Sequence, residues 1–272
     1  MECIAPITVP IETPPVRRLQ IVRCGQCRAC RIRRKLAWTG RMLMEFEEAR
    51  ERAFFLTLTY EDAPDVLDYR DFQLFMKRWR KANGPCRFVA VGEYGEKSGR
   101  GHWHAIIYNQ LALCFGSHRI DSWNHGYAYF GSATRESIGY VAGYTLKENK
   151  DGRRSHFRTS NRPGIGLSGV RRLAKKTAGH FLEKPLGSWP SSYTIRGRRY
   201  PLCAGAQTAF QDAYLKKGGL PPRESDPDLL HSEAMAYSLG DAFFEERMRR
   251  DKWAALEKEG SDGQKARRIT SL

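Results

Sequence analysis

The chain has 272 residues, enough for one large domain or for one domain with extensions. Its 46 lysines and arginines outnumber 30 acidic residues and give a formal net charge of +16. This excess favours a polyanionic partner, because each cation that meets a phosphate releases condensed counterions; a merely soluble basic protein is the alternative. No apolar run approaches the roughly 20 residues of a membrane-spanning helix, and the first residues lack the pattern of a secretory signal. We therefore expect an intracellular protein without a membrane partner.

The N-terminal part of the chain divides into an arm and a basic head. Residues 1–22 are rich in proline and show neither a helical nor a strand period, which predicts an extended arm. Six arginines or lysines and no acid follow between Arg23 and Lys35, and the next residues predict a helix over Leu36–Arg52. We interpret the basic run as a phosphate-contacting patch, with a solvated helix face as the alternative. Its members are Arg28, Arg31, Arg33, Arg34 and Lys35.

The chain contains seven cysteines, an odd number that favours a reducing compartment over a disulfide framework. Three of them have the spacing C-x2-C-x2-C: Cys24, Cys27 and Cys30. They could give three thiolates to a structural Zn²⁺, with the fourth ligand from Cys3, Cys86 or Cys203. An iron–sulfur run would need its next cysteine at position 34, where Arg34 stands. Free thiols remain the alternative.

The middle of the chain alternates short strands with one helix. FFLTLTY at residues 54–60 alternates apolar residues with threonines, the period of a strand with one buried face. CRFVAVGEY at residues 86–94 and HWHAIIYN at residues 102–109 predict two strands joined as a hairpin by a glycine-containing turn. Between the first and second strands, residues 71–82 predict a helix with an aromatic core stripe. That stripe is formed by Phe72, Phe75, Met76 and Trp79.

Further elements are predicted toward the C-terminus. Residues 126–133 read as a strand, and the spacing in residues 134–150 suits a helix. SYTIRGRRYPL at residues 192–202 resembles a small hairpin, and residues 206–217 form a short amphipathic helical pattern. From residue 224 onward the chain is charged and helical in period.

Two histidines stand one residue apart in the third strand, at His102 and His104. Successive side chains of a strand alternate between faces, so both imidazoles emerge on the same side, with Trp103 toward the core. If the preceding strand forms a hairpin with this one, Glu93 lies near the pair. Two imidazoles and a carboxylate leave metal positions open for water and a phosphate oxygen. Satisfied structural histidines are the alternative to this metal site.

GYVAGYTLK places two phenols and an ammonium on one stripe, if the segment is helical. Tyr140, Tyr144 and Lys147 then fall at i, i+4 and i+7. Gly139 and Gly143 would each weaken the helix by about 1 kcal/mol relative to alanine, which suggests that something approaches the backbone closely. A tyrosine stripe that only packs in a core or an interface is the alternative.

The histidine and tyrosine motifs together indicate phosphoryl transfer. A phenol with a pKa of about 10 is a poor nucleophile near neutrality, but a metal and an ammonium can stabilise the charge that develops when it attacks phosphorus. Attack on a phosphodiester yields a phosphotyrosine and a free hydroxyl. The bond energy is thereby kept for later rejoining.

The order FLTLTY, GEYGEKSGRGHWH and YVAGYTLK resembles the three motifs of the HUH endonucleases, named for two histidines around a hydrophobic residue. The CGQCRACR head and the RPGIG segment further resemble the replication initiators of gokushovirus-type microviruses, phages with circular single-stranded DNA. The resemblance spans Cys24 to Gly166. It implies an α+β fold, a mainly antiparallel sheet with flanking helices related to ferredoxin-like and RNA-recognition architectures. Residues 1–22 would be the arm, 23–185 the nicking domain, and 186–272 a C-terminal hairpin and helical extension.

The resemblance also implies roles for individual residues. His102, His104 and Glu93 would hold Mg²⁺ or Mn²⁺ on the scissile phosphate, and Tyr140 and Tyr144 would be the nucleophiles. Lys147 would sit beside the phosphate, while Thr57 and Thr59 match the first motif, whose role is structural or DNA-contacting.

The implied activity is nicking of single-stranded DNA at a replication origin. The 5′ end stays on a tyrosine, and the free 3′-hydroxyl primes rolling-circle replication. Host helicase and polymerase would be partners, in the cytoplasm of the host bacterium.

Two other classes of protein compete with this interpretation. Cupin-type metal oxygenases also use a His-x-His pair, but they place the acid shortly after the second histidine, where this chain has residues 106–109, IIYN. A non-catalytic module that binds single-stranded nucleic acid needs only charge and aromatic residues. It leaves the histidine pair without a role.

Overall fold

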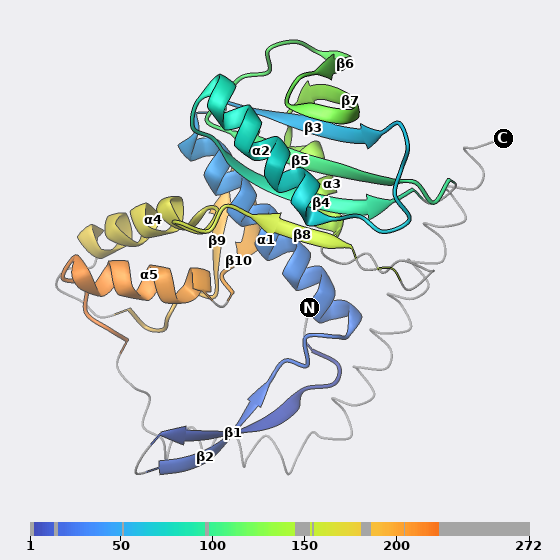
Figure 1. The fold of residues 1–272 in the computed structure, drawn as a ribbon. Coiled ribbons are helices and arrows are strands. Elements are labelled where there is room, and N and C mark those ends of the chain that lie inside the picture. The colour runs from blue at the N-terminus through green and yellow to red at the C-terminus, as the bar shows by residue number, and fades with distance from the viewer. Residues whose placement is uncertain are drawn as a thin grey trace. The chain divides into compact units, whose positions relative to one another are not determined.

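The computed structural model describes residues 3–13, 16–50, 52–95, 98–144, 153, 155–180, 186–203 and 205–222. The chain divides into two compact units, residues 1–221 and 222–272, and the first holds nearly all described residues. Within the described ranges the order of elements is β1 (Ile7–Thr13), β2 (Val16–Val22), α1 (Arg28–Glu48), β3 (Ala53–Tyr60), α2 (Tyr69–Asn83), β4 (Arg87–Tyr94), β5 (Gly101–Tyr108), β6 (Gly116–Ile120), β7 (Trp123–Ser132), α3 (Arg135–Gly143), β8 (His156–Thr159), α4 (Leu167–His180), β9 (Ser192–Ile195), β10 (Arg198–Pro201) and α5 (Gly205–Lys216) (Figure 1).

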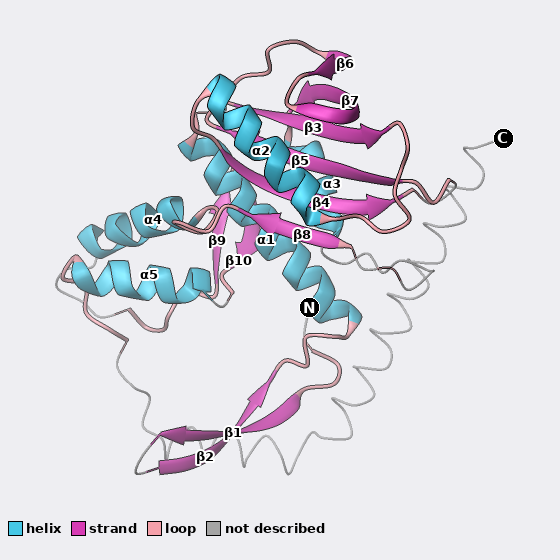
Figure 2. Cartoon of the chain, in the orientation of Figure 1, coloured by secondary structure: helices cyan, strands magenta, loops and turns pink. Residues whose placement is uncertain are grey.

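A six-stranded sheet organises the first unit, with strand order β6-β7-β3-β5-β4-β8 and every neighbouring pair antiparallel (Figure 2). Helix α2 covers one face, and α1 and α3 lie against the other. The predicted α+β class is therefore confirmed. An open sheet with edge strands also differs from the closed double-sheet jelly roll of cupins. No helix among the described residues is both long and apolar enough to cross a bilayer.

The face under α2 is built as the apolar alternation predicted. Phe54, Leu56 and Leu58 of β3 point into this face and are at most 1% exposed. The stripe on α2 packs onto them, and all four of its predicted residues are buried. Asp68 begins this helix by accepting a hydrogen bond of 2.8 Å from the amide of Arg70, which satisfies an otherwise unpaired donor.

The opposite face forms a second core that extends beyond the sheet. Residues of β4, β5, α1 and α3 share this core with α4, the β9–β10 hairpin and α5. The predicted C-terminal hairpin and the helix after it are thus present. They pack on the same core as the sheet, through buried side chains such as Tyr200 and Phe210.

The RPGIG segment attaches to the middle of α1. Gly166 has a φ of +72° and lies against the backbone of Arg41, so a side chain at this position would be strained and would collide with that backbone. The amide of Gly166 donates to Glu45 Oε2 at 2.8 Å, and Arg41 Nε donates to the carbonyl of Ile165 at 2.9 Å. Glu45 also pairs with Arg87 of β4. This segment therefore ties α1 to the sheet.

Several elements differ from the sequence-based expectation. Helix α1 begins at Arg28, not at residue 36, because the basic run itself forms its first two turns. The arm predicted to be merely extended contains the β1–β2 hairpin, with its strands paired from Ile7↔Val22 to Thr13↔Val16. Strands β6 and β8 and helix α4 were not predicted. The helical pattern from residue 224 onward lies outside the described residues.

Candidate metal and tyrosine site

The register of the sheet sets the predicted site residues in two rows across four strands, β4, β5, β3 and β7. Directly opposed residues of antiparallel strands share a face, so each row lies on the side of the sheet where α1 and α3 pack. One row is Glu93, His102, Thr59 and Tyr127. The next row is Val91, His104, Thr57 and Tyr129.

Glu93 and the histidine pair converge on one point, as the hairpin between β4 and β5 predicted. His102 Nε2 is 3.0 Å and His104 Nε2 is 3.2 Å from the same oxygen, Glu93 Oε1. The two Nε2 atoms are 3.1 Å apart. An octahedral ion with ligands at about 2.1 Å separates adjacent donors by about 3 Å, so the three donors fit one divalent cation. Glu93 is only 3% exposed, which limits the screening of its charge by water.

The outer nitrogens of the two rings set their inner ones. His102 Nδ1 contacts the carbonyl of Arg100 at 3.1 Å, and a carbonyl can only accept, so Nδ1 carries the hydrogen. Nε2 of the neutral ring then has a lone pair that faces Glu93. His104 Nδ1 contacts Thr57 Oγ1 at 2.9 Å, and a hydrogen donated to that hydroxyl leaves its Nε2 with a lone pair too. Three electron-pair donors facing one another call for a cation between them.

Helix α3 brings both predicted tyrosines over this group of donors. Thr134 and Ser137 form a reciprocal capping box that fixes the start of the helix. Tyr140 and Tyr144 lie one turn apart, and their hydroxyls are hydrogen-bonded to each other. The Tyr144 ring stacks on His104 with centroids 5.7 Å apart, and the Tyr140 ring meets His104 edge-on at 5.4 Å. The predicted stripe therefore faces the histidine pair.

The two phenols differ in environment. Tyr140 is 50% exposed and also contacts Phe55 edge-on. Tyr144 is partly buried, and burial together with hydrogen bonds to Tyr140 and Glu93 holds the pKa of its phenol well above the ordinary value. Without a cation beside Glu93, the Tyr144 phenol therefore stays protonated, because a second negative charge next to the carboxylate is unfavourable.

Lys147, predicted to sit beside the phosphate, lies outside the described residues. A different ammonium lies near the same end of α3: a Cβ at Gly143 would be 3.5 Å from Lys35 Nζ. Gly139 has no protein atom within 4 Å of such a Cβ, so protein packing does not account for that glycine. Lys35 links the tyrosine helix to the basic turns of α1.

The residues predicted to contact DNA occupy two places. The basic patch forms the first two turns of α1, where Arg28 and Arg34 are exposed. Thr57 and Thr59 lie on β3 beside the histidines, and Thr59 is exposed with its hydroxyl donating to the Tyr127 carbonyl at 3.2 Å. Thr57 serves His104 directly, which is a structural role.

Two tyrosines of β7 belong to the same face and were not identified from the sequence. Tyr127 is 44% and Tyr129 is 47% exposed, and they continue the two rows beyond the threonines. Arg119 lies over the Tyr127 ring, 4.7 Å from its centroid. A depression of about 500 Å³ opens between Tyr127 and His102, with Arg100 on its wall. Alternation in GYAYFGSA revealed a strand, but its direction toward this face depends on the register with β3.

The predicted zinc ligands also come together. They are Cys24, Cys27 and Cys30. Of the candidates for a fourth ligand, Cys3 joins them. Cys86 is buried in the core under α2, and Cys203 follows β10.

Comparison with known proteins matches this region to replication proteins. Residues 53–149 match the family model of the replication-associated protein ORF2, and this stretch contains the three metal-ligand candidates and both tyrosines of α3. The chain is 30% identical over 198 residues to the replication-associated protein VP4 of Bdellovibrio phage phiMH2K, an alignment that covers 61% of this chain and 62% of that protein. The chain is related to the replication-associated proteins of phages. The resemblance inferred from the motifs is thereby confirmed.

Two further relatives agree. The replication-associated protein ORF4 of Chlamydia phage 1 is 31% identical over 151 residues, covering 46% of this chain and 38% of that protein. The replication-associated protein ORF2 of Spiroplasma virus 4 is 28% identical over 155 residues, covering 47% of this chain and 48% of that protein. The chain thus spans between 38% and 62% of these curated relatives. No solved structure matches the chain.

Proposed function

We propose that the protein acts in phage replication as a metal-dependent tyrosine endonuclease. It cleaves single-stranded DNA at a replication origin, holds the 5′ end on a tyrosine, and later rejoins the strand. The observation that carries this proposal is the contact of Tyr140 and Tyr144 with His104, beside the converging donors of Glu93 and His102. Nucleophile candidates and cation ligands share one small site. A non-catalytic binding module has no need of that arrangement.

The proposed step exchanges one phosphoester bond for another. A tyrosine Oη attacks phosphorus and forms an O–P bond, the bond from phosphorus to the 3′ oxygen breaks, and that oxygen takes up a proton as the new 3′-hydroxyl. Bound Mg²⁺ or Mn²⁺ would supply Lewis-acid stabilisation of the charge that develops on the phosphate oxygens. The attacking phenol loses its proton during the step. For Tyr144, the partner phenol and the Glu93 carboxylate are both in contact with the hydroxyl.

Two phenols allow initiation to be coupled to termination. Because the hydroxyls of Tyr140 and Tyr144 are in contact, each can reach the same phosphate position after a modest shift. One would hold the 5′ end while the other cuts the regenerated origin. The freed 3′-hydroxyl would then attack the first phosphotyrosine, which releases a closed circle and restores the phenol.

The face around the site suits single-stranded DNA. Exposed tyrosines such as Tyr127 and Tyr129 offer flat surfaces on which bases stack irrespective of sequence. The basic turns of α1 end at Lys35 beside α3, and so provide cations for the phosphates that flank the cut. In the host cytoplasm, helicase and polymerase of the bacterium would extend the 3′-hydroxyl.

The experiment that tests this function looks for the covalent intermediate. The protein is mixed with a labelled single-stranded oligonucleotide that carries the phage origin, in the presence of Mn²⁺, and the products are separated under denaturing conditions. We expect label to migrate with the protein and a shortened strand with a free 3′-hydroxyl. Binding of the oligonucleotide without cleavage, at any concentration of Mg²⁺ or Mn²⁺, would contradict the enzyme and favour the binding module.

A further inference from the structure

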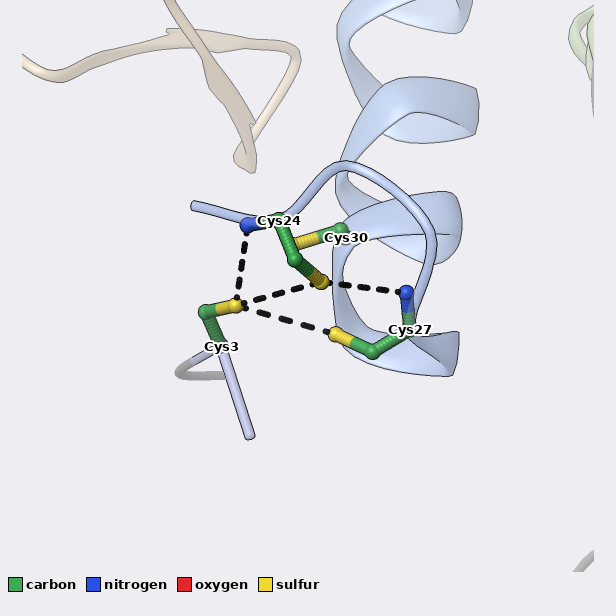
Figure 3. Close-up of side chains that lie close together, drawn as sticks. All are labelled: Cys3, Cys24, Cys27 and Cys30. Carbon is green, nitrogen blue, oxygen red and sulfur yellow. Dashed lines mark hydrogen bonds between the residues drawn. The ribbon is translucent and has the colours of Figure 1, made fainter. Parts of the chain in front are cut away.

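Four thiols from two separate stretches of the chain converge at the start of α1 (Figure 3). Cys3 precedes β1, Cys24 and Cys27 lie between β2 and α1, and Cys30 lies in the first turn of α1. The four sulfur atoms lie within 4.8 Å of one another. Cys3 Sγ is 3.5 Å from Cys24 Sγ and 3.9 Å from Cys27 Sγ.

These separations suit one tetrahedral ion. A Zn–S bond of about 2.3 Å places the sulfurs of a tetrahedral site about 3.8 Å apart. A disulfide requires about 2.05 Å between its sulfurs, and all the cysteines are free. The four-thiol group therefore has the spacing of a metal site and not that of a disulfide pair.

The backbone around the thiols is arranged to support thiolates. The amide of Cys24 donates to Cys3 Sγ and the amide of Cys27 donates to Cys24 Sγ, both at 3.3 Å. The second bond closes a tight turn in which Gly25 has a φ of +74°. Arg34 reaches back from α1 and donates to the Gly25 carbonyl at 2.9 Å. Hydrogen bonds of this kind hold the ligands of a metal in place before it binds.

We infer that Cys3, Cys24, Cys27 and Cys30 bind one structural Zn²⁺ that fastens the N-terminal end of the chain to α1. Four protein ligands complete a tetrahedral shell and leave no open position, so this ion takes no part in DNA cleavage. Four thiolates and one divalent ion sum to a charge of −2, which the arginines of the first turns of α1 offset. The ion thus fixes the part of α1 that carries the basic patch.

Metal analysis of the full-length protein tests this inference. The chain is purified under reducing, oxygen-free conditions, its zinc content is measured by mass spectrometry, and Co²⁺ is then exchanged into the site. We expect about one Zn²⁺ per chain and, with cobalt, the visible absorption of a tetrahedral tetrathiolate complex. Protein that contains no stoichiometric zinc and gives no such cobalt spectrum overturns the inference, as does stoichiometric iron in its place.

Variants distinguish the four ligands from the other cysteines. Cys3→Ser should lose the Zn²⁺ and increase amide hydrogen exchange in residues 3–30, whereas Cys3→His should keep the metal because imidazole replaces thiolate in many zinc sites. Cys203→Ser is the matched control and should keep it too. Zinc retained in Cys3→Ser, or lost in Cys203→Ser, would refute the assignment. These readouts do not involve cleavage, so their failure leaves the proposed endonuclease unaffected.

Discussion

At the scale of single residues, the partner of each imidazole's outer nitrogen matters as much as the imidazole. Arg100 fixes one ring through a backbone carbonyl, and Thr57 holds the other through its hydroxyl. Both contacts leave lone pairs pointed at the oxygen of Glu93. The site is thus arranged for a cation before one arrives, and the tyrosines are placed by contact with the same rings.

Removal of either imidazole should abolish cleavage and leave most of the DNA affinity. His102→Ala and His104→Ala each remove a metal ligand, and we expect adduct formation to fall on the order of 100-fold or more. Phosphate contacts elsewhere supply most non-specific binding, so fluorescence anisotropy should show little change. His118→Ala, on the exposed strand β6, is the control that should cleave normally. Full activity in either site variant would remove the metal from the mechanism.

Thr57 offers a test of the tautomer argument that leaves every ligand in place. Thr57→Val keeps the shape of the side chain but deprives His104 Nδ1 of its partner. We expect Mn²⁺ affinity, measured by calorimetry, to weaken by roughly 10- to 100-fold. Thr59→Val should leave it unchanged, since that hydroxyl bonds the Tyr127 carbonyl instead. Equal effects from both variants would show that the contact with His104 has no special role.

The tyrosine pair should share the chemistry. Tyr140→Phe and Tyr144→Phe should each retain some cleavage of an oligonucleotide, and the double variant should lose it entirely. Neither single variant should sustain repeated rounds of replication, because a second phenol is needed to cut the regenerated origin. If one single variant forms no adduct while the other replicates normally through many rounds, the second tyrosine is only a neighbour on the helix.

At the scale of elements, β7 extends the candidate site into a binding face. Its tyrosines carry on the rows of side chains that begin at Glu93 and Val91, which is possible only because β7 pairs with β3. That pairing joins segments far apart in the chain. Sequence periodicity detects each strand by itself, so it predicted the strand but not the partner, and the exposed rings were missed.

Stacking on β7 can be measured without cleavage. Tyr127→Ala and Tyr129→Ala should each weaken binding of single-stranded DNA by about 1–3 kcal/mol, with little dependence on sequence. Tyr127→Phe and Tyr129→Phe should bind nearly as the parent does, since the ring is kept. An alanine variant that binds as tightly as its phenylalanine counterpart would place the DNA elsewhere.

The basic turns of α1 should reveal themselves through salt. If Arg28 and Lys35 each meet a phosphate, replacing either with glutamine should reduce the slope of log affinity against log salt by about 0.7, the value for single strands. Lys217→Gln, beyond α5, is the charge-matched control. A slope that changes no more in Arg28→Gln or Lys35→Gln than in the control would restore the alternative of a solvated helix face.

Elements that are amphipathic were predictable, and elements defined by pairing were not. Strand β3 and helix α2 each bury one face, so apolar alternation located them. Helix α1 was predicted to start late because its first turns carry basic side chains where a core stripe would be expected. The short edge strands β6 and β8 have few apolar residues, and only their neighbours in the sheet make them strands.

At the scale of the whole molecule, distant contacts complete what local motifs begin. The sequence motifs predicted Glu93, both histidines and both tyrosines, because each motif lies within one short segment. The choice of Cys3 over Cys86 and Cys203 depended on the path of the chain around β1 and β2, which no local spacing encodes. The α+β class followed from the resemblance to a family.

The central claim is that a tyrosine of α3 becomes covalently joined to DNA, and peptide mapping of the adduct tests it most directly. Trypsin should cut after Arg135 and Lys147 and release residues 136–147, which contain both phenols. After nuclease trimming, mass spectrometry should find this peptide carrying a 5′-linked nucleotide on Tyr140 or Tyr144. A nucleotide on any other peptide, or a cleaved strand with a free 5′-phosphate and no adduct, would contradict the account.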